Sequence, residues 1–167
     1  MIQNEKEKFI RVSKEIAKAN SVSIYTHVNP DCDTLSCALS LRLALISLGK
    51  QVDVYSVDPV PETLCVLNGA DSVKLPEKKV HDLSIAVDCD SLERIGNAMR
   101  SFLSSKVQIA IDHHKTHAKF ADVTLLDTDV SACAEIVYRL LTYMKLMSKD
   151  VAELLFAGIV TDSGCFQ

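Results

Sequence analysis

The sequence predicts an α/β domain built on a doubly wound, mostly parallel sheet of about five strands, with helices on both faces. Several strand-like runs, such as LSIAV and VQIAI, are apolar throughout, as is typical of parallel strands buried on both faces. Segments with apolar residues at helical spacing separate these runs, which favours alternation of strands and helices. With 167 residues, of which 48% are hydrophobic, the chain can bury one core, and we expect a single domain.

The first half of the chain alternates helix and strand. Apolar residues at helical spacing predict an opening helix through Phe9, Val12, Ile16 and Ala19. The run SVSIYTH at 21–27 is rich in β-branched and aromatic residues and predicts a strand. The segment from Thr34 to Leu48 is almost wholly apolar or small, and Gly49 supplies a C-terminal stop, so we expect a helix packed on both sides. QVDVYSV at 51–57 is the next expected strand.

The second half continues the same alternation. LSIAVD at 83–88 and VQIAID at 107–112 read as buried strands that each end in an acid. The other expected elements are, in order, a short helix from Glu62 to Leu67, a short strand from Ser72 to Leu75, a helix from Ser91 to Leu103, a short strand VTLLD at 123–127, and helices from Ser131 to Leu146 and from Lys149 to Val160.

Composition narrows the partners and the compartment. The net charge of −4 gives no reason to expect binding to duplex DNA or to anionic lipid. No apolar run is long enough to span a bilayer, and the charged N-terminal segment lacks a signal-peptide core, so we expect a cytoplasmic protein with no membrane partner.

The six cysteines form no C-x-x-C pair, and this excludes the usual thiolate zinc spacing. We expect reduced thiols. Four of them lie in or beside apolar or small-residue runs and are expected to pack as small hydrophobic side chains: Cys37, Cys65, Cys89 and Cys133.

Polar side chains gather where the predicted strands end. Ligands of doubly wound sheets bind beyond the carboxyl ends of the strands. Three separate strand ends bring acids and imidazoles to that edge: His27, Asp31 and Asp33 after the first strand, Asp88 after LSIAV, and Asp112, His113 and His114 at the end of VQIAID.

Each of these residues could also have an ordinary structural role. Asp33 could cap the helix that starts at Thr34, Asp88 could cap the helix that follows it, and a histidine after a strand often only bonds the backbone. Taken together, however, several carboxylates at one edge repel one another by several kcal/mol unless protons or cations relieve them. The joint pattern therefore favours a metal site.

Oxygen and imidazole ligands without thiolate suit a hard or borderline divalent ion, with Mn²⁺ first and Mg²⁺, Co²⁺ and Zn²⁺ as alternatives. The candidate ligands outnumber the needs of one ion, so we expect two. Two ions about 3.5–4 Å apart, bridged by a carboxylate and a hydroxide, hydrolyse phosphate esters by in-line attack.

Four ordered motifs resemble those of the DHH phosphoesterase family: HVNPDCD at 27–33, VDCDSLERIG at 87–96, IDHHK at 111–115 and GIVTDSG at 158–164. The stretches VDPVPE, NGAD and SACAEIVY further resemble the bacterial nanoRNase/pAp phosphatase branch of the family. Members of that branch degrade very short RNA and remove the 3′-phosphate of 3′-phosphoadenosine 5′-phosphate. The resemblance implies that residues 1–167 form a DHH catalytic domain, without the C-terminal, DHHA1-type substrate-binding domain, and it favours a fragment of a longer protein.

The resemblance also implies roles for single residues. Asp88 would bridge the two ions, His114 would contact the scissile phosphate, and Asp112 would orient its neighbours. The remaining Mn²⁺ ligands would be His27 and Asp31 at one ion and Asp33, His113 and Asp162 at the other. Weaker candidates for phosphate contact are Ser131, which could instead cap a helix, and Lys115 and Arg94, which could instead be solvated surface charges.

The sequence departs from the family pattern at several positions. Relatives usually carry glycines where this chain has Cys32 and Ser36, which predicts a local change of backbone geometry. His117 stands where the branch commonly has asparagine and is left out of the expected site, and His81 is expected to be exposed.

Three functions remain open. The first is an Mn²⁺-dependent phosphoesterase that acts on short single-stranded RNA or on 3′-phosphoadenosine 5′-phosphate. The second keeps the chemistry and changes the substrate to pyrophosphate or to cyclic or linear dinucleotides, because NPDxD with a non-glycine middle residue is closer to the pyrophosphatase version of the loop. The third is a non-catalytic metal-binding module. A homodimer is left open.

Overall fold

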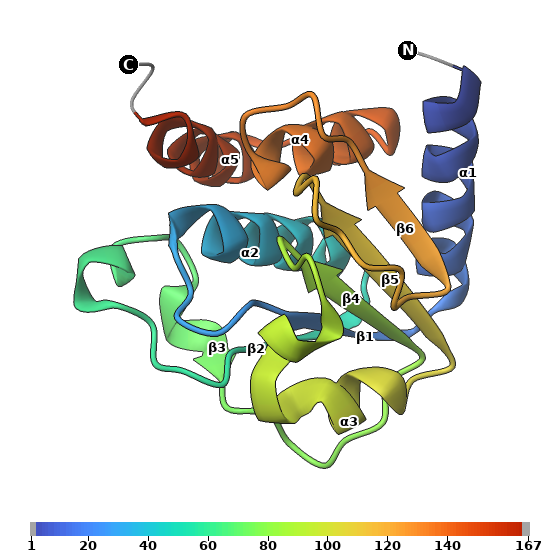
Figure 1. Ribbon diagram of the computed structural model, residues 1–167, viewed down its shortest axis with the longest axis horizontal. Coiled ribbons are helices and arrows are strands. Elements are labelled where there is room, and N and C mark those ends of the chain that lie inside the picture. The colour runs from blue at the N-terminus through green and yellow to red at the C-terminus, as the bar shows by residue number, and fades with distance from the viewer. Residues whose placement is uncertain (1–2, 165–167) are drawn as a thin grey trace.

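Six parallel strands form one sheet in the computed structural model, which describes residues 3–164, with side chains from Lys6 onward (Figure 1). The strand order is β3-β2-β1-β4-β5-β6, and every neighbouring pair is parallel. The sheet was expected to have about five strands and has six, and the expected short strand from Ser72 to Leu75 is the two-residue β3. The strands are β1 Ser21–Tyr25, β2 Gln51–Tyr55, β3 Val73–Lys74, β4 Leu83–Val87, β5 Val107–Asp112 and β6 Val123–Leu126.

The strand order reverses between β1 and β4, and this reversal positions the site. From β1 the chain proceeds outward to β2 and β3, and from β4 it proceeds the other way to β5 and β6. The connections diverge at this point, and ligands of such sheets bind in the crevice that this geometry favours, beyond the carboxyl ends of β1 and β4. The two strands end almost level, with Tyr25 beside Ala86. His27 and Asp88 follow them directly.

Helices cover both faces of the sheet, which confirms the predicted fold class (Figure 1). One face packs against α1, α2 and α4, with α5 lying against α2 and α4, and the opposite face packs against η3 and α3. The helices are α1 Gln3–Lys18, α2 Cys32–Ile46, α3 Met99–Leu103, α4 Cys133–Tyr143 and α5 Lys149–Asp162, with 3₁₀ turns η1 Glu62–Leu64, η2 Ala70–Ser72 and η3 Leu92–Ala98.

The helix α2 is enclosed almost completely, as its apolar sequence predicts. Residues 32–41 are all buried, between the sheet on one side and α5 on the other. The helix ends at Ile46, and Gly49 then adopts the left-handed conformation, φ 76°, that lets the chain turn into β2. The ligand candidates at the start of α2 therefore belong to a rigid part of the core.

The segment after β4 differs from the continuous helix expected from Ser91 to Leu103. It forms the 3₁₀ helix η3 and then the short α3, because Gly96 has φ 63° and breaks the helical path. A Cβ at Gly96 would lie 3.0 Å from methyl groups of Val28 and Val57, so this glycine also permits close packing beneath the β1 loop.

Smaller expectations were also wrong. The short helix from Glu62 to Leu67 is only the 3₁₀ turn η1, and Cys65 beside it is exposed instead of packed in the core. His81 is buried, not exposed, with Nε2 3.0 Å from Asp53 Oδ2. The remaining core cysteines are buried as expected, and Cys165 lies outside the described residues. Within the range 3–164 there is no helix with both the length and the apolar character needed to cross a membrane.

Candidate metal centre

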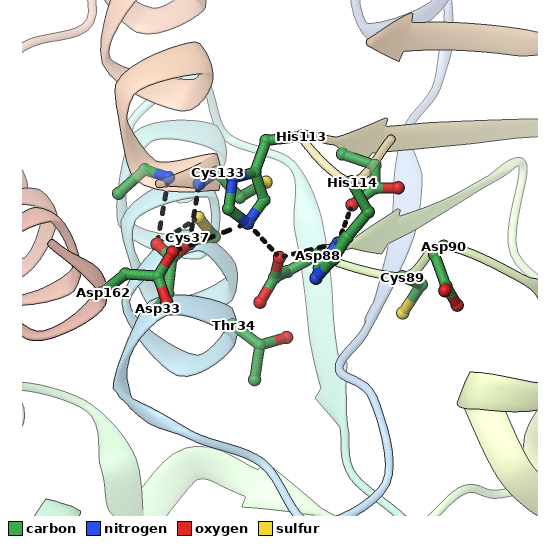
Figure 2. Close-up of polar contacts among 12 residues, drawn as sticks. Asp33, Thr34, Cys37, Asp88, Cys89, Asp90, His113, His114, Cys133 and Asp162 are labelled. Atoms are coloured by element: carbon green, nitrogen blue, oxygen red, sulfur yellow. Dashed lines mark hydrogen bonds and ion pairs between the residues drawn. The ribbon is translucent and has the colours of Figure 1, made fainter. Parts of the chain in front are cut away.

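Asp88 occupies the middle of the crevice and faces two histidines at once. Its side chain is buried, with Oδ2 3.5 Å from His27 Nε2. Its other oxygen, Oδ1, lies 3.4 Å from His113 Nε2 (Figure 2). The backbone of Asp88 is left-handed, φ 57°, and its N–H donates to the Ile111 carbonyl at 2.8 Å. Asp88 therefore does not cap the following helix, which starts after Ser91. Instead, each of the two carboxylate oxygens of Asp88 faces a different group of ligand candidates.

The first group lies in the loop between β1 and α2. His27 directs Nδ1 to the Val28 carbonyl at 2.8 Å, which leaves Nε2 free to face Asp31 Oδ2 at 3.4 Å and Asp88. The other oxygen of Asp31 accepts from Thr34 N at 3.1 Å, so Asp31 is the N-cap of α2. The alternative in which Asp33 caps this helix is wrong. Donor atoms of His27, Asp31 and Asp88 lie within 4.8 Å of one another.

The second group joins three elements. Asp33, buried in the first turn of α2, accepts hydrogen bonds from the backbone N–H of Cys133 at 2.6 Å and of Ala134 at 3.0 Å, so it faces the N-terminus of α4. His113 follows β5, and its Nε2 is 3.5 Å from Asp162 Oδ2 near the end of α5 (Figure 2). Donor atoms of Asp33, His113 and Asp162 also lie within 4.8 Å of one another.

The pKa values of the two histidines and of Asp33 reflect how closely the charged groups of the centre are packed. Burial lowers the pKa of His27, but contacts with Asp31 and Asp88 outweigh it and raise that pKa to about 10. The Asp88 carboxylate, ahead of the opposing effect of burial, raises the pKa of His113 to about 9. Burial and the neighbouring Asp88 charge raise the pKa of Asp33 to about 7. In the free protein, protons on these groups offset the clustered negative charge.

A divalent cation fits the same residues. Across the described chain, Oδ1 of Asp88 is one of the buried side-chain atoms that find no hydrogen-bond partner, and a buried acceptor of this kind is costly. The surrounding donors are carboxylate oxygens and imidazole nitrogens, a set that suits Mn²⁺, Mg²⁺ or Co²⁺. A cation placed here would replace the protons that the free protein holds.

Beside the centre, Asp112 connects two more histidines. Its Oδ1 lies 2.7 Å from His114 Nδ1 and its Oδ2 lies 2.6 Å from His117 Nδ1. Asp112 is fully buried; burial raises its pKa, but the hydrogen bonds from His117 and His114 lower it to below its ordinary value. His114 is 42% exposed and has Nδ1 3.7 Å from Asp88 Oδ1, so it stands between the centre and solvent.

His117 was missed by sequence reasoning. The N–H of His117 donates to the His114 carbonyl at 3.2 Å, and this turn returns its imidazole to Asp112. The spacing DHHxxH, with a third histidine shortly after the pair, was the signal that could have identified it.

Gly158 is a second residue that sequence reasoning left without a role. A Cβ at this position would lie 2.9 Å from Asp33 Oδ1 and 3.1 Å from the Cβ atoms of Ala134 and Ser36. Gly158 therefore lets α5 approach Asp33 closely and carries Asp162 to the centre.

The weaker candidates are less closely placed. Ser131 donates both its N–H and its hydroxyl to Glu135 Oε1, at 2.9 and 2.6 Å, and does not cap α4, whose N-cap is Ala132. Lys115 is exposed beyond His114, and Arg94 lies in η3, where its carbonyl accepts from Val28 N at 2.8 Å.

The two residues that replace glycines of the family pattern pack against each other. Cys32 Sγ lies 3.7 Å from Ser36 Oγ, and both side chains are buried on α2. Neither replacement interrupts the helix that carries Asp33.

The family model that matches the chain is described as the DHH family, N-terminal domain, and covers residues 21–159. A curated relative from Thermus thermophilus, the bifunctional oligoribonuclease and PAP phosphatase NrnA, is 31% identical over 164 residues, which is 95% of this chain and 48% of the relative. The protein of the same name from Bacillus subtilis is 26% identical over 92% of this chain and 49% of its own length. The chain thus spans about half the length of the curated relatives it matches.

Solved structures agree with the fold. An exopolyphosphatase-related protein from Bacteroides fragilis superposes with a TM-score of 0.90 at 27% identity, covering 97% of this chain and 52% of that one. RecJ from Thermus thermophilus, solved in complex with Mn²⁺, gives a TM-score of 0.55 at 18% identity, covering 96% of this chain and 24% of its own. This second likeness concerns the fold alone.

Proposed function

The chain belongs to the DHH family, and on that premise we propose that it is the metal-binding, catalytic half of a phosphoesterase that hydrolyses short single-stranded RNA and 3′-phosphoadenosine 5′-phosphate. Relatives that match most of the chain carry both activities in their names. A second, substrate-binding domain would complete the enzyme, since the chain spans about half of those relatives. We propose that it acts in the cytoplasm on nucleotide substrates, and that it binds neither duplex DNA nor membranes.

The bridging position of Asp88 carries this proposal. Its two oxygens face different imidazoles, each of which belongs to a separate group of donors. This arrangement suits two divalent cations that share one carboxylate. His27 and Asp31 would hold one cation, Asp33, His113 and Asp162 the other, and we take Mn²⁺ as the metal that suits this donor set best.

The cations, when bound, supply a hydroxide nucleophile near neutral pH and neutralise phosphate charge. The residues of the chain position the groups that take part in this reaction. Asp112 fixes the orientation of His114 through the 2.7 Å hydrogen bond to Nδ1, which leaves Nε2 for the substrate. His114 is partly exposed beside Asp88, so it can form a hydrogen bond with the scissile phosphate and stabilise the charge that develops on the leaving oxygen. Lys115 and Arg94 would contact phosphates farther from the reacting bond.

A hydrolysis assay tests this function. The purified chain, with and without Mn²⁺, is incubated separately with 3′-phosphoadenosine 5′-phosphate, an RNA dinucleotide, linear pApA and pyrophosphate, and the products are quantified. Release of phosphate or of mononucleotides, with pyrophosphate left intact, supports the proposal. Cleavage of pyrophosphate alone would show that the chain is a pyrophosphatase. If the chain binds metal but turns over no substrate, even after a C-terminal domain from a relative is added, it is a binding module.

The matched variants are Asp88→Asn and Asp129→Asn. Both changes remove one carboxylate, but Asp129 is exposed, and only its backbone N–H makes a hydrogen bond, to Asp127. We expect Asp88→Asn to abolish turnover and to lower the bound Mn²⁺, measured by elemental analysis after gel filtration, while Asp129→Asn behaves as the unchanged chain. An active Asp88→Asn protein would exclude the bridging role.

A further inference from the structure

A cavity of about 400 Å³ lies between α1, β6 and the segment that connects β5 to β6. Figure 1 shows α1 running beside β6 at one edge of the sheet, away from α3. None of the six ligand candidates of the metal centre lines this cavity. Its size falls in the range of pockets that hold small molecules, about 300–1,000 Å³.

The charge around the cavity is positive. Lys8, Arg11 and Lys119 line it together with one acid, Asp122. The acid is already engaged, since its Oδ2 accepts from Gln108 N at 2.9 Å. Neither Lys8 nor Lys119 has a hydrogen bond or ion pair with any part of the chain that the structure describes. Three basic side chains against one carboxylate thus leave a net positive charge around this cavity, in a chain whose net charge is −4.

Two other lining residues carry buried polar atoms that lack partners. Nε2 of His117 and Oγ1 of Thr124 form no hydrogen bond with any described residue. The His117 side chain is only 3% exposed, and Nδ1 is held by Asp112 at 2.6 Å, so the ring cannot turn its free nitrogen to solvent without losing that bond. A buried polar atom without a partner is costly; since both atoms are closed to solvent, a ligand supplies the partner only after the cavity wall shifts to expose them.

We propose that this cavity is a second binding site, for the phosphate group of a small phosphomonoester. A phosphate accepts hydrogen bonds from the lysine and arginine side chains around the cavity. Once the wall shifts to expose them, it also accepts from the Thr124 hydroxyl, and its protonated form donates to His117 Nε2. Ala121 and Leu126 provide the apolar part of the wall for the organic group. The site is separate from the metal centre, so the proposal does not depend on whether the chain hydrolyses nucleotides.

Nuclear magnetic resonance of the ¹⁵N-labelled chain in EDTA tests the site without metal. The chain is titrated with inorganic phosphate, with AMP and with adenosine. We expect phosphate and AMP to give saturable shifts of the amides of residues 8, 11 and 117–124, and adenosine to give none. Tighter binding of AMP would identify a phosphomonoester as the ligand, and equal affinities would identify free phosphate as sufficient. Shifts with adenosine alone, or shifts confined to Asp88 and His113, would overturn the proposal.

Exposed or half-exposed lysines provide matched variants that keep the fold. Lys8→Gln and Lys119→Gln should each weaken phosphate binding about tenfold, because each removes a charge-assisted hydrogen bond. Lys14→Gln changes an exposed lysine of the same helix that does not line the cavity, and it should leave the affinity unchanged. Thr124→Val, which removes only the hydroxyl, should also weaken binding. Unchanged affinity in a Lys8→Gln/Lys119→Gln double variant would refute the site.

Discussion

Cys133 donates its backbone N–H to the Asp33 carboxylate over 2.6 Å, and this bond joins the first turn of α4 to the first turn of α2. The same carboxylate is buried beside Asp88, and this surrounding raises its pKa to about 7. Asp33 therefore has a structural role as a helix partner and a proposed role as a metal ligand. Both roles use the ionised carboxylate, whereas burial and the charge of Asp88 favour the protonated form in the free protein.

The raised pKa of Asp33 predicts a pH-dependent stability of the metal-free chain. Below the unfolded pKa of about 3.9 both states hold the proton. Between about pH 4 and 7 the folded chain alone holds it, so rising pH removes up to about 1.4 kcal/mol of stability per unit, and above pH 7 the loss is complete. The Asp33→Asn variant has no titrating group at this position, so its stability does not fall in this way as the pH rises.

Urea unfolding from pH 5 to 8 measures this effect as the difference in stability between Asp33→Asn and the unchanged chain. We expect the difference to shift in favour of the variant up to about pH 7 and then to level off. Asp129→Asn, at an exposed position, serves as the control. A difference that stays constant over this range would contradict the assigned pKa.

Metal binding should release protons and strengthen as the pH rises. The pKa values of His27 and His113 are raised to about 10 and about 9, so both imidazoles carry protons at pH 7 that a cation must displace. Calorimetric titration with Mn²⁺ in buffers of different ionisation enthalpy gives the number of protons released. Asp33, with a pKa of about 7, adds part of a proton, so we expect between about two and three at pH 7 and fewer at pH 9. An affinity that is independent of pH would count against these residues as ligands.

Gly158→Ala should disturb the centre through packing alone. The new methyl group would lie 2.9 Å from Asp33 Oδ1 and 3.1 Å from the Cβ atoms of Ala134 and Ser36, so α5 must move outward. Overpacking of this kind costs about 1–3 kcal/mol. We expect a lower unfolding midpoint together with weaker Mn²⁺ binding, because Asp162 moves with the helix.

Phe156→Ala on the same helix is the control, since Phe156 is 63% exposed and its loss should leave both quantities nearly unchanged. Full metal affinity in Gly158→Ala would show that α5 need not approach Asp33 so closely.

Asp112→Asn should separate catalysis from metal binding. An amide cannot accept from both His114 and His117, so the orientation of His114 is lost while the metal-facing donors remain. With 3′-phosphoadenosine 5′-phosphate as substrate, we expect kcat to fall about 100-fold or more, in the range found for positioned acid–base groups, and Mn²⁺ affinity to change less than about tenfold. If metal affinity falls as far as kcat, Asp112 acts on the ligands and not on His114.

Much of this arrangement could be predicted because it depends on local pattern and on the geometry of parallel sheets. Continuous apolar runs indicated the strands, and the common edge of their carboxyl ends brought His27, Asp88 and His113 together. The exchange of roles between Asp31 and Asp33 was not predictable, since both precede an apolar helix at suitable spacing. The difference arises when α4, 100 residues away in the chain, brings the backbone N–H of Cys133 to the Asp33 carboxylate.

Other features depended on contacts that no local pattern encodes. His81 was expected to be exposed because its neighbours are charged, yet the pairing with Asp53 on β2 buries it. The helix after β4 was expected to be continuous because its composition is helical, yet Gly96 breaks it where the chain passes Val28 and Val57. Gly158 gave no signal because its importance arises only when α5 meets α2.

The enclosure of α2 bears on how such a domain can diversify. Asp33 lies in the first turn of a helix whose residues 32–41 are all buried, so substitutions along this segment cost folding stability as well as altering the centre. The segment 58–69, by contrast, contains no buried residue and tolerates substitution. Exposed loops of this frame can therefore vary while the packing of α2 keeps Asp33 in place.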